Sequence, residues 1–196
     1  LAEATAETLR RIAGGEPLIH PDIEAIAKPD AVLASNTSSL KLEDIAAGLK
    51  HPSRLIGIHF FNPVAKMPLV EVVEGKDSDP QALKRGMAFV RKIDKLALPV
   101  KSAPGFLVNA VLAPYMQEAM RCVDEGIAPE VVDEAALAFG MPLGPIELAD
   151  TVGLDIAVAA GKQLASGISE PPRKLMELVN AGHLGRKTGR GFYTYN

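Results

Sequence analysis

The chain has 196 residues, a formal net charge of −3 and 23% charged residues, as expected of an ordinary globular protein. Its hydrophobic fraction of 47% excludes a mostly disordered chain, and the slightly acidic balance argues against a nucleic-acid binder. The one cysteine, Cys122, cannot form an intramolecular disulfide, so a reducing, cytoplasmic setting is expected. No apolar run approaches the roughly 20 residues that span a bilayer, so no membrane partner is expected.

The first hundred residues alternate between helical patterns and short apolar runs. Apolar residues at helical spacing predict helices over residues 1–13, 22–28, 41–49 and 80–94. Short apolar runs predict strands over residues 31–34, 55–60, 69–73 and 96–100. This alternation is typical of an α/β layer with a mostly parallel sheet.

From Ala103 onward the pattern is helical, with glycine and proline between the segments. The predicted helices cover residues 105–125, 129–139, 145–166 and 171–181. A glycine-rich basic loop with an aromatic end follows them. We therefore expect two domains, an α/β domain over residues 1–101 and a helical domain over residues 102–196.

His59 and Glu71 are the strongest candidates for chemistry. His59 stands near the end of an apolar strand, where side chains of an open α/β sheet tend to face the ligand crevice. Glu71 interrupts the apolar run LVEVV, and a buried carboxylate needs a partner. A pair of the two on neighbouring strands would orient an acid/base imidazole. The alternatives are a core histidine bonded to a backbone carbonyl and a solvent-facing glutamate on an edge strand.

Two further polar sites are weaker candidates. The loop Ser35–Ser39 follows a predicted strand and offers hydroxyls and an amide that suit a carbonyl or hydroxyl oxygen. Its alternative role is to cap the next helix, through Ser39. Asn109 lies in an apolar helix and needs a partner, which a neighbouring helix can also supply. No G-x-G-x-x-G turn, P-loop, G-x-S-x-G or metal-binding H-E-x-x-H occurs.

Five segments, taken together and in order, resemble the 3-hydroxyacyl-CoA dehydrogenase family. They are ASNTSS at 34–39, IGIHFFNPVAKMPLVEVV at 56–73, KSAPGFLVNAVL at 101–112, GMPLGPIELADTVGLD at 140–155 and LGRKTGRGFYTYN at 184–196. The resemblance implies a Rossmann-like NAD-binding domain, here partial, followed by a helical domain that usually dimerises. It also implies NAD-dependent oxidation of L-3-hydroxyacyl-CoA to 3-ketoacyl-CoA, in fatty-acid β-oxidation or a related short-chain pathway.

The resemblance also implies a role for each matching residue. His59 would be the general base, and Glu71 would orient its ring. Ser38 would hydrogen-bond near the reacting oxygen and the nicotinamide, with Asn36 in the same cofactor-side loop. Asn109 would contact the substrate oxygen. Lys187 would reach the cofactor, and no metal is implied.

The chain departs from the family pattern at two places. The family usually has Asn-Arg where this chain has Asn109-Ala110, and its glycine-rich turn has no counterpart in the sequence. A second hypothesis is therefore a truncated, non-catalytic dehydrogenase module that dimerises or docks in a larger β-oxidation protein. A third is a dehydrogenase of free hydroxy acids, against which the HFFNP and GRKTGRGFY motifs count.

Overall fold

The computed structural model describes residues 22–38, 40–164 and 170–195. The helix predicted over residues 1–13 and the capping role of Ser39 lie outside this part of the chain. The chain folds as two compact units, Leu1–Leu107 and Val108–Asn196. The division comes after Leu107, whereas the sequence analysis places a boundary after Lys101.

The first unit holds a four-stranded sheet in the order β1-β2-β3-β4. The strands are β1 (Leu33–Ser35), β2 (Leu55–Phe60), β3 (Leu69–Glu74) and β4 (Leu96–Lys101). β1 pairs with β2 and β3 with β4 in parallel, whereas β2 and β3 run antiparallel. This is the mostly parallel, Rossmann-like sheet that the sequence predicts. The helical elements of this unit are α2 (Ile23–Ile26), α3 (Leu42–Ala46), the 3-10 turn η1 (Pro52–Arg54) and α4 (Pro80–Lys92).

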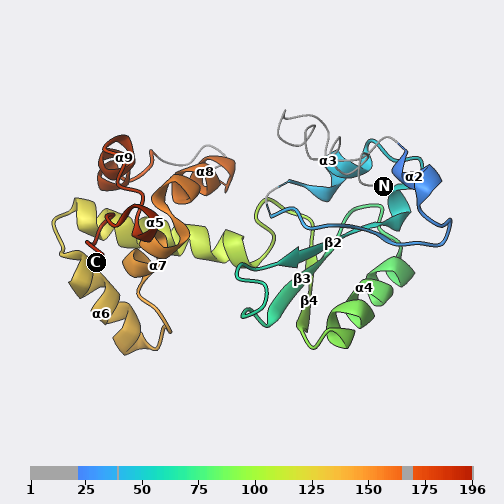
Figure 1. Cartoon of the computed structure of the whole chain (residues 1–196), viewed down its shortest axis with the longest axis horizontal. Coiled ribbons are helices and arrows are strands. Elements are labelled where there is room, and N and C mark those ends of the chain that lie inside the picture. The colour runs from blue at the N-terminus through green and yellow to red at the C-terminus, as the bar shows by residue number, and fades with distance from the viewer. Residues whose placement is uncertain (1–21, 39, 165–169, 196) are drawn as a thin grey trace. The chain divides into compact units, whose positions relative to one another are not determined.

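The central strands are buried on both faces, because α3 and α4 lie on opposite sides of the sheet (Figure 1). α4 begins where the Asp79 carboxylate accepts the backbone N–H of Gln81 and Pro80 occupies the first turn. Its buried positions 82, 86 and 90 form one stripe at helical spacing. That stripe packs on one set of alternating strand side chains, Ile56, Ile58, Val70 and Val72. The other set, which contains Leu55 and Val73, faces α3 and Phe106.

The second unit is helical. Its elements are α5 (Val108–Asp124), α6 (Pro129–Phe139), α7 (Pro145–Val152), α8 (Leu154–Leu164), α9 (Arg173–Asn180) and the 3-10 turn η2 (Arg186–Thr188). The single helix predicted over residues 145–166 is wrong. The chain breaks at Gly153, whose φ of 109° is open to glycine but strained for other residues, and α8 starts at the next residue. The core of the helical unit includes Met120, Ile146, Leu154 and Leu175.

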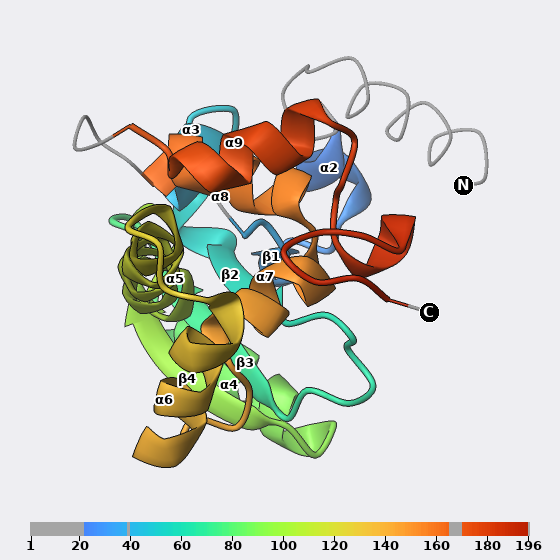
Figure 2. The same cartoon turned by 90° about the vertical axis from the view of Figure 1, so that its left-hand side faces the viewer.

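Two buried carboxylates fasten the C-terminal segment to this helical core. Asp150 of α7 accepts the backbone N–H groups of Phe192 and Tyr193 and the hydroxyl of Tyr195. Gly191 is needed here, since a Cβ at that position would lie 2.1 Å from Asp150 Oδ1. The last residues therefore pass close beside α7 (Figure 2).

Asp133 of α6 stabilises the start of α7 in the same way, through hydrogen bonds to its carboxylate. Its carboxylate accepts the backbone N–H groups of Ile146 and Glu147, which begin that helix, and the hydroxyl of Tyr193. Residue 144 must be glycine because a Cβ there would lie 2.2 Å from Asp133 Cγ. The two aspartates thus stabilise a helix start and a chain end without any disulfide.

These contacts predict an alkaline loss of stability in the helical unit. Burial, and then the hydrogen bonds to Asp133 and Asp150, raise the pKa values of Tyr193 and Tyr195. The folded state therefore keeps phenol protons that the unfolded chain releases above about pH 10. The stabilisation is complete below that pH and is lost progressively as the pH rises from there toward the raised pKa values of the folded state.

Urea unfolding between pH 8 and pH 11 measures this effect. We expect the free energy of unfolding to fall more steeply above pH 10 in the wild type than in the Tyr193→Phe/Tyr195→Phe double variant. If the free energy of unfolding fell equally steeply with pH in both proteins, Tyr193 and Tyr195 would not be the source of the alkaline loss of stability.

Candidate active site

His59 and Glu71 form a buried hydrogen-bonded pair across the two antiparallel strands. They are register partners on β2 and β3, so their side chains leave the same face of the sheet. His59 Nδ1 lies 2.8 Å from Glu71 Oε2, and the two residues are 5% and 0% exposed. The predicted pair therefore forms, and Glu71 lies on an inner strand, not at an edge.

The pair determines which ring nitrogen of His59 is available. An ionised carboxylate only accepts hydrogen bonds, so Nδ1 donates its proton to Glu71. Nε2 of the neutral ring then carries a lone pair and can accept a proton from another group. This is the arrangement of an oriented general base.

Aromatic side chains and a backbone N–H complete the surroundings of the pair. The imidazole lies 4.6 Å from the ring of Phe61 and 5.6 Å from the ring of Phe106, measured between ring centroids. The second oxygen of the carboxylate, Glu71 Oε1, accepts the backbone N–H of Leu107 at 3.0 Å. Both oxygens of Glu71 therefore have a defined partner.

The loop after β1 lies next to the end of β2. The two strands are parallel, so their carboxyl ends share one edge of the sheet. Asn36 Oδ1 accepts the backbone N–H of Phe60 at 3.0 Å, which ties the loop to the residue that follows His59. Ser38 is exposed in the same loop. The structure thus brings Asn36 and Ser38 to the strand edge where His59 lies.

Asn109 and Lys187 belong to the other unit. Asn109 is half-buried in the first turn of α5. Lys187 lies in η2, and its ammonium group donates to both oxygens of Asp155 at 2.5 and 2.7 Å. That hydrogen bond lowers the pKa of the Asp155 carboxyl. The structure gives Lys187 an ion pair that the sequence analysis did not predict.

Lys95 is a residue near the site that the sequence analysis missed. Its ammonium group donates to the backbone carbonyls of Val64 and Met67, at 2.6 and 2.8 Å. These carbonyls belong to the loop 61–68, which connects the strand of His59 to the strand of Glu71. Backbone acceptors leave no mark in the sequence, so no side-chain pattern pointed to Lys95.

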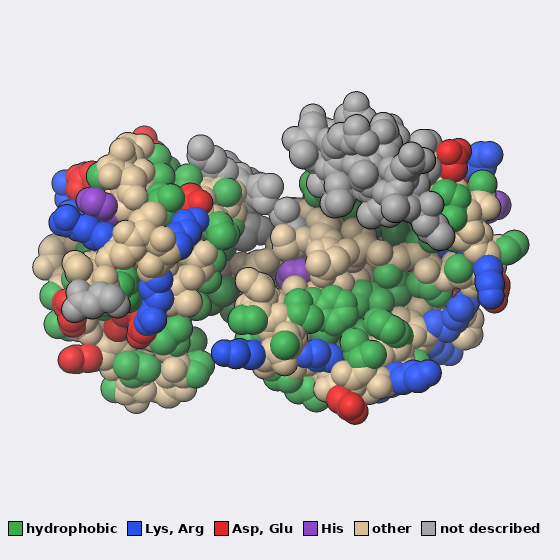
Figure 3. All heavy atoms as spheres, viewed as in Figure 1, with side chains coloured by type: hydrophobic (Ala, Val, Ile, Leu, Met, Phe, Trp, Pro, Cys, Tyr) green, Lys and Arg blue, Asp and Glu red, His purple; other side chains and the backbone are tan. Residues whose placement is uncertain are grey.

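The surface of the first unit also shows a broad apolar area in the space-filling view, with lysine and arginine side chains around its rim (Figure 3).

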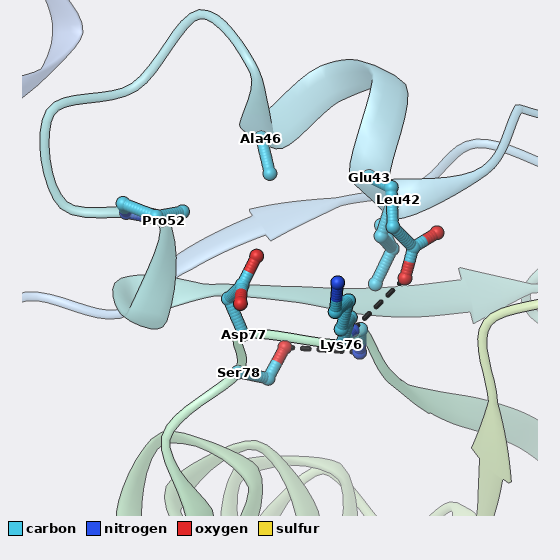
Figure 4. A pocket seen from close by; sticks show the side chains of 8 residues that line it. Leu42, Glu43, Ala46, Pro52, Lys76, Asp77 and Ser78 are labelled. Carbon is cyan, nitrogen blue, oxygen red and sulfur yellow. Dashed lines mark hydrogen bonds between the residues drawn. The ribbon is translucent and has the colours of Figure 1, made fainter.

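A small pocket at the opposite end of the sheet is structural. It lies where β2 begins and β3 ends, between α3 and the segment after β3 (Figure 4). Glu43 accepts the N–H of Lys76 and the hydroxyl of Ser102, and Ser78 bonds the carbonyl of Leu55. The Glu43 carboxylate and the Ser78 hydroxyl of this pocket are thus used by the fold itself.

Within the described residues, no three His, Cys, Asp or Glu side chains are grouped as a metal site requires. In the same part of the chain, no helix has the length and apolar character needed to cross a bilayer. The chemistry of the site therefore has to be judged from His59, Glu71 and the loops around them.

Comparison with known proteins decides the family. Residues 18–103 match the model of the 3-hydroxyacyl-CoA dehydrogenase NAD-binding domain, and residues 105–195 match that of the C-terminal domain of the same enzymes. The chain belongs to the 3-hydroxyacyl-CoA dehydrogenase family. The resemblance in the five sequence segments is thereby confirmed.

Individual relatives agree with the family models. The chain is 44% identical over 179 residues to a probable 3-hydroxybutyryl-CoA dehydrogenase of Bacillus subtilis, covering 88% of this chain and 62% of that protein. It is 43% identical to the alpha subunit of a fatty acid oxidation complex of Vibrio campbellii, covering 89% of this chain and 25% of the subunit. The chain therefore spans about three fifths of the first relative and a quarter of the second.

A solved structure supports the same fold. The (S)-3-hydroxybutyryl-CoA dehydrogenase of Ralstonia eutropha superposes with a TM-score of 0.84 at 38% identity. The match covers 90% of this chain and 64% of that enzyme. The predicted fold class, a partial Rossmann-like sheet followed by a helical domain, is confirmed.

Lys95 generates a prediction about the loop 61–68 of this dehydrogenase-family chain. In Lys95→Met the stem remains but both hydrogen bonds are lost, which we expect to lower the free energy of unfolding by about 1 kcal/mol. The backbone N–H groups of Lys66 and Met67, which bond Pro63 within the loop, should also exchange faster with solvent.

Lys92→Met is the matched control, because Lys92 is an exposed residue at the end of α4. We expect it to change the free energy of unfolding by less than about 0.5 kcal/mol. If both substitutions changed hydrogen exchange at Lys66 and Met67 equally, Lys95 would not be the residue that holds the loop 61–68. Hydrogen exchange followed by NMR makes the comparison.

Proposed function

We propose that the chain carries the acid/base site of an NAD-dependent 3-hydroxyacyl-CoA dehydrogenase. The observation that carries the proposal is the buried pair of His59 and Glu71, with both carboxylate oxygens bonded and Nε2 of the ring left to accept a proton. Family membership supports the reaction class, and the loop that bears Asn36 and Ser38 supports the location of the site.

In the proposed oxidation, Nε2 of His59 accepts the proton of the substrate's 3-hydroxyl group while hydride leaves C3. The C3–O bond becomes a carbonyl, and the imidazole becomes an imidazolium that the ionised Glu71 stabilises. NAD supplies the hydride acceptor when it is bound. In the reverse direction the imidazolium returns the proton to the oxygen. Glu71 keeps the ring in one orientation throughout and fixes the tautomer of its neutral form.

The remaining polar residues have proposed positioning roles. Ser38 would donate its hydroxyl to the substrate oxygen, and Asn36 would hold the loop while its amide group faces the cofactor side. The resemblance assigns Asn109 a contact with the substrate oxygen and Lys187 one with the cofactor. Lys187 would have to exchange its partner Asp155 for this contact, or act together with it.

The described residues fit one end of NAD better than the other. Hydroxyl and amide groups in the loop after β1 suit the nicotinamide carboxamide and ribose, and the loop lies at the carboxyl edge of the sheet. No glycine-rich strand-to-helix turn for a pyrophosphate occurs among them. Residues 1–101 would form the cofactor domain and residues 102–196 the substrate and dimer domain.

The proposed substrate is an L-3-hydroxyacyl-CoA of fatty-acid or short-chain acyl-CoA metabolism in the cytoplasm, with no nucleic-acid or membrane partner. The relatives' names, which include a 3-hydroxybutyryl-CoA dehydrogenase and a fatty acid oxidation subunit, support this class. The alternative role is a non-catalytic module of a larger β-oxidation protein. Binding of NADH by this chain, followed by fluorescence, separates the two, because a module without cofactor would not bind it.

Histidine substitution tests the proposed function. We expect His59→Gln to lower kcat for acetoacetyl-CoA reduction by roughly 10²–10⁴-fold, because the acid/base group is lost. Glu71→Gln should cause a loss of similar order, since an amide can hold the wrong ring tautomer. NADH absorbance measures both rates.

His51→Gln is the control, because His51 is exposed and lies before β2. Its kcat should remain within about twofold of the wild type. Wild-type turnover in His59→Gln would remove His59 from the mechanism. Absence of turnover in a folded wild type that also fails to bind NADH would favour the non-catalytic module.

We also propose that two copies of the chain pair through the helical unit. Exposed apolar side chains there include Val111, Val131, Leu137 and Phe139, and Phe139 is 88% exposed at the end of α6. Sedimentation should give a dimer whose dissociation constant rises at least about tenfold in Phe139→Asp. Phe89→Asp, in the first unit, is the matched control and should leave the dimer unchanged. A wild-type monomer at micromolar concentration would contradict the proposal.

A further inference from the structure

We propose that Phe106 is a positioning residue for His59, held in place by a left-handed bend at Gly105 and Phe106. The inference rests on the proposed function, because it assigns a role within that site. It concerns the segment 105–107 (the connector), which closes the first unit. Neither composition nor periodicity singled out this phenylalanine.

The connector has an unusual backbone. Gly105 has φ of 72°, and Phe106 follows it with φ of 50°. A positive φ is ordinary for glycine but unfavourable for a bulky aromatic residue. Such a conformation persists only where the surrounding structure enforces it, and it is often found at functional sites. The contacts that keep Phe106 in this conformation therefore matter.

Two consecutive residues of the connector touch both members of the buried pair. The ring of Phe106 is 4% exposed and meets the imidazole of His59 edge-on, at 5.6 Å and an interplanar angle of 61°. The next backbone N–H, that of Leu107, donates to Glu71 Oε1 at 3.0 Å. The bend therefore places the Phe106 ring against His59 and the Leu107 N–H against Glu71.

These contacts restrict the motions that would misplace Nε2. The imidazole contacts the rings of both Phe61 and Phe106, and these contacts limit the space in which it can rotate. The Glu71 carboxylate is bonded at both oxygens, so its plane is set by His59 and Leu107 together. Proton transfer requires the acceptor nitrogen in one direction, and small displacements lower the rate.

Core packing alone is the competing explanation. Phe106 also belongs to the apolar cluster that contains Leu42, Ile45 and Leu55. A purely structural residue would lower the stability on substitution without changing the ring of His59 or the N–H of Leu107. The two explanations therefore differ in what NMR observes at those two groups.

The test uses the full chain and three variants. Phe106→Leu removes the ring but keeps an apolar side chain, and Phe106→Tyr keeps the ring. Ile45→Ala removes an aliphatic side chain from the same apolar cluster and leaves both aromatic neighbours of His59 in place. The ¹⁵N shifts of the His59 ring nitrogens report the tautomer, and hydrogen exchange reports the Leu107 N–H.

We expect Phe106→Leu to move the ring-nitrogen shifts toward a mixture of tautomers and to speed Leu107 exchange by at least about tenfold. Phe106→Tyr should retain the wild-type values. Ile45→Ala should lose stability and keep the wild-type ring shifts. If Phe106→Leu does not fold, Phe106→Met replaces it, because methionine fills irregular core space.

The proposal is overturned if Phe106→Leu keeps wild-type ring shifts and Leu107 exchange, or if Ile45→Ala changes them equally. Turnover supplies a separate readout: Phe106→Leu should lower kcat while KM stays within about twofold. A wild type that shows the expected NMR behaviour but no turnover would count against the proposed function alone. The two failures are thus distinguishable.

Discussion

The burial of the Glu71 carboxylate is the constraint on which the first unit depends. A charged group with 0% exposure in the middle of a sheet needs hydrogen-bond donors at both oxygens, and it has them in His59 Nδ1 and the Leu107 N–H. Removing one partner of such a pair typically costs about 3–5 kcal/mol, since the remaining charge stays buried. The need to satisfy one carboxylate therefore joins β2, β3 and the connector. The antiparallel pairing of β2 and β3 makes this possible, because it sets the two side chains directly opposite each other.

The helical unit uses the same device for a different purpose. Asp133 and Asp150 are buried at 7% and 0% exposure, and each accepts two backbone N–H groups and a tyrosine hydroxyl. Here the carboxylates do no proposed chemistry; they hold a helix start and the chain end. What separates the two cases is the partner. Backbone and tyrosine donors keep their protons at neutral pH, whereas an imidazole can exchange one through its far nitrogen.

Sequence reasoning recovered what depends on local pattern and missed what depends on unusual backbone. The short apolar runs at β2 and β3, the conspicuous Glu71 in LVEVV and the histidine near a strand end were enough to predict the pair of His59 and Glu71. The break at Gly153 was missed because the apolar periodicity continues through it, and only its φ of 109° ends the helix. Lys95 and Phe106 were missed for related reasons. Lys95 binds backbone carbonyls, which the sequence does not reveal. Phe106 owes its position to a positive φ, which is not expected for phenylalanine from its residue type.

The connector has a consequence for dissecting the chain into parts. A cut after Lys101, where the sequence pattern changes, would separate Phe106 and Leu107 from the histidine and glutamate that they contact. The isolated first segment would then lack the Leu107 N–H that donates to Glu71 Oε1 and the Phe106 ring that contacts the imidazole. A cut after Leu107 keeps both contacts within a single polypeptide and leaves α5 intact. Expression boundaries chosen from the three-dimensional contacts, and not from the change in composition, would therefore keep the buried pair together with the groups that contact it.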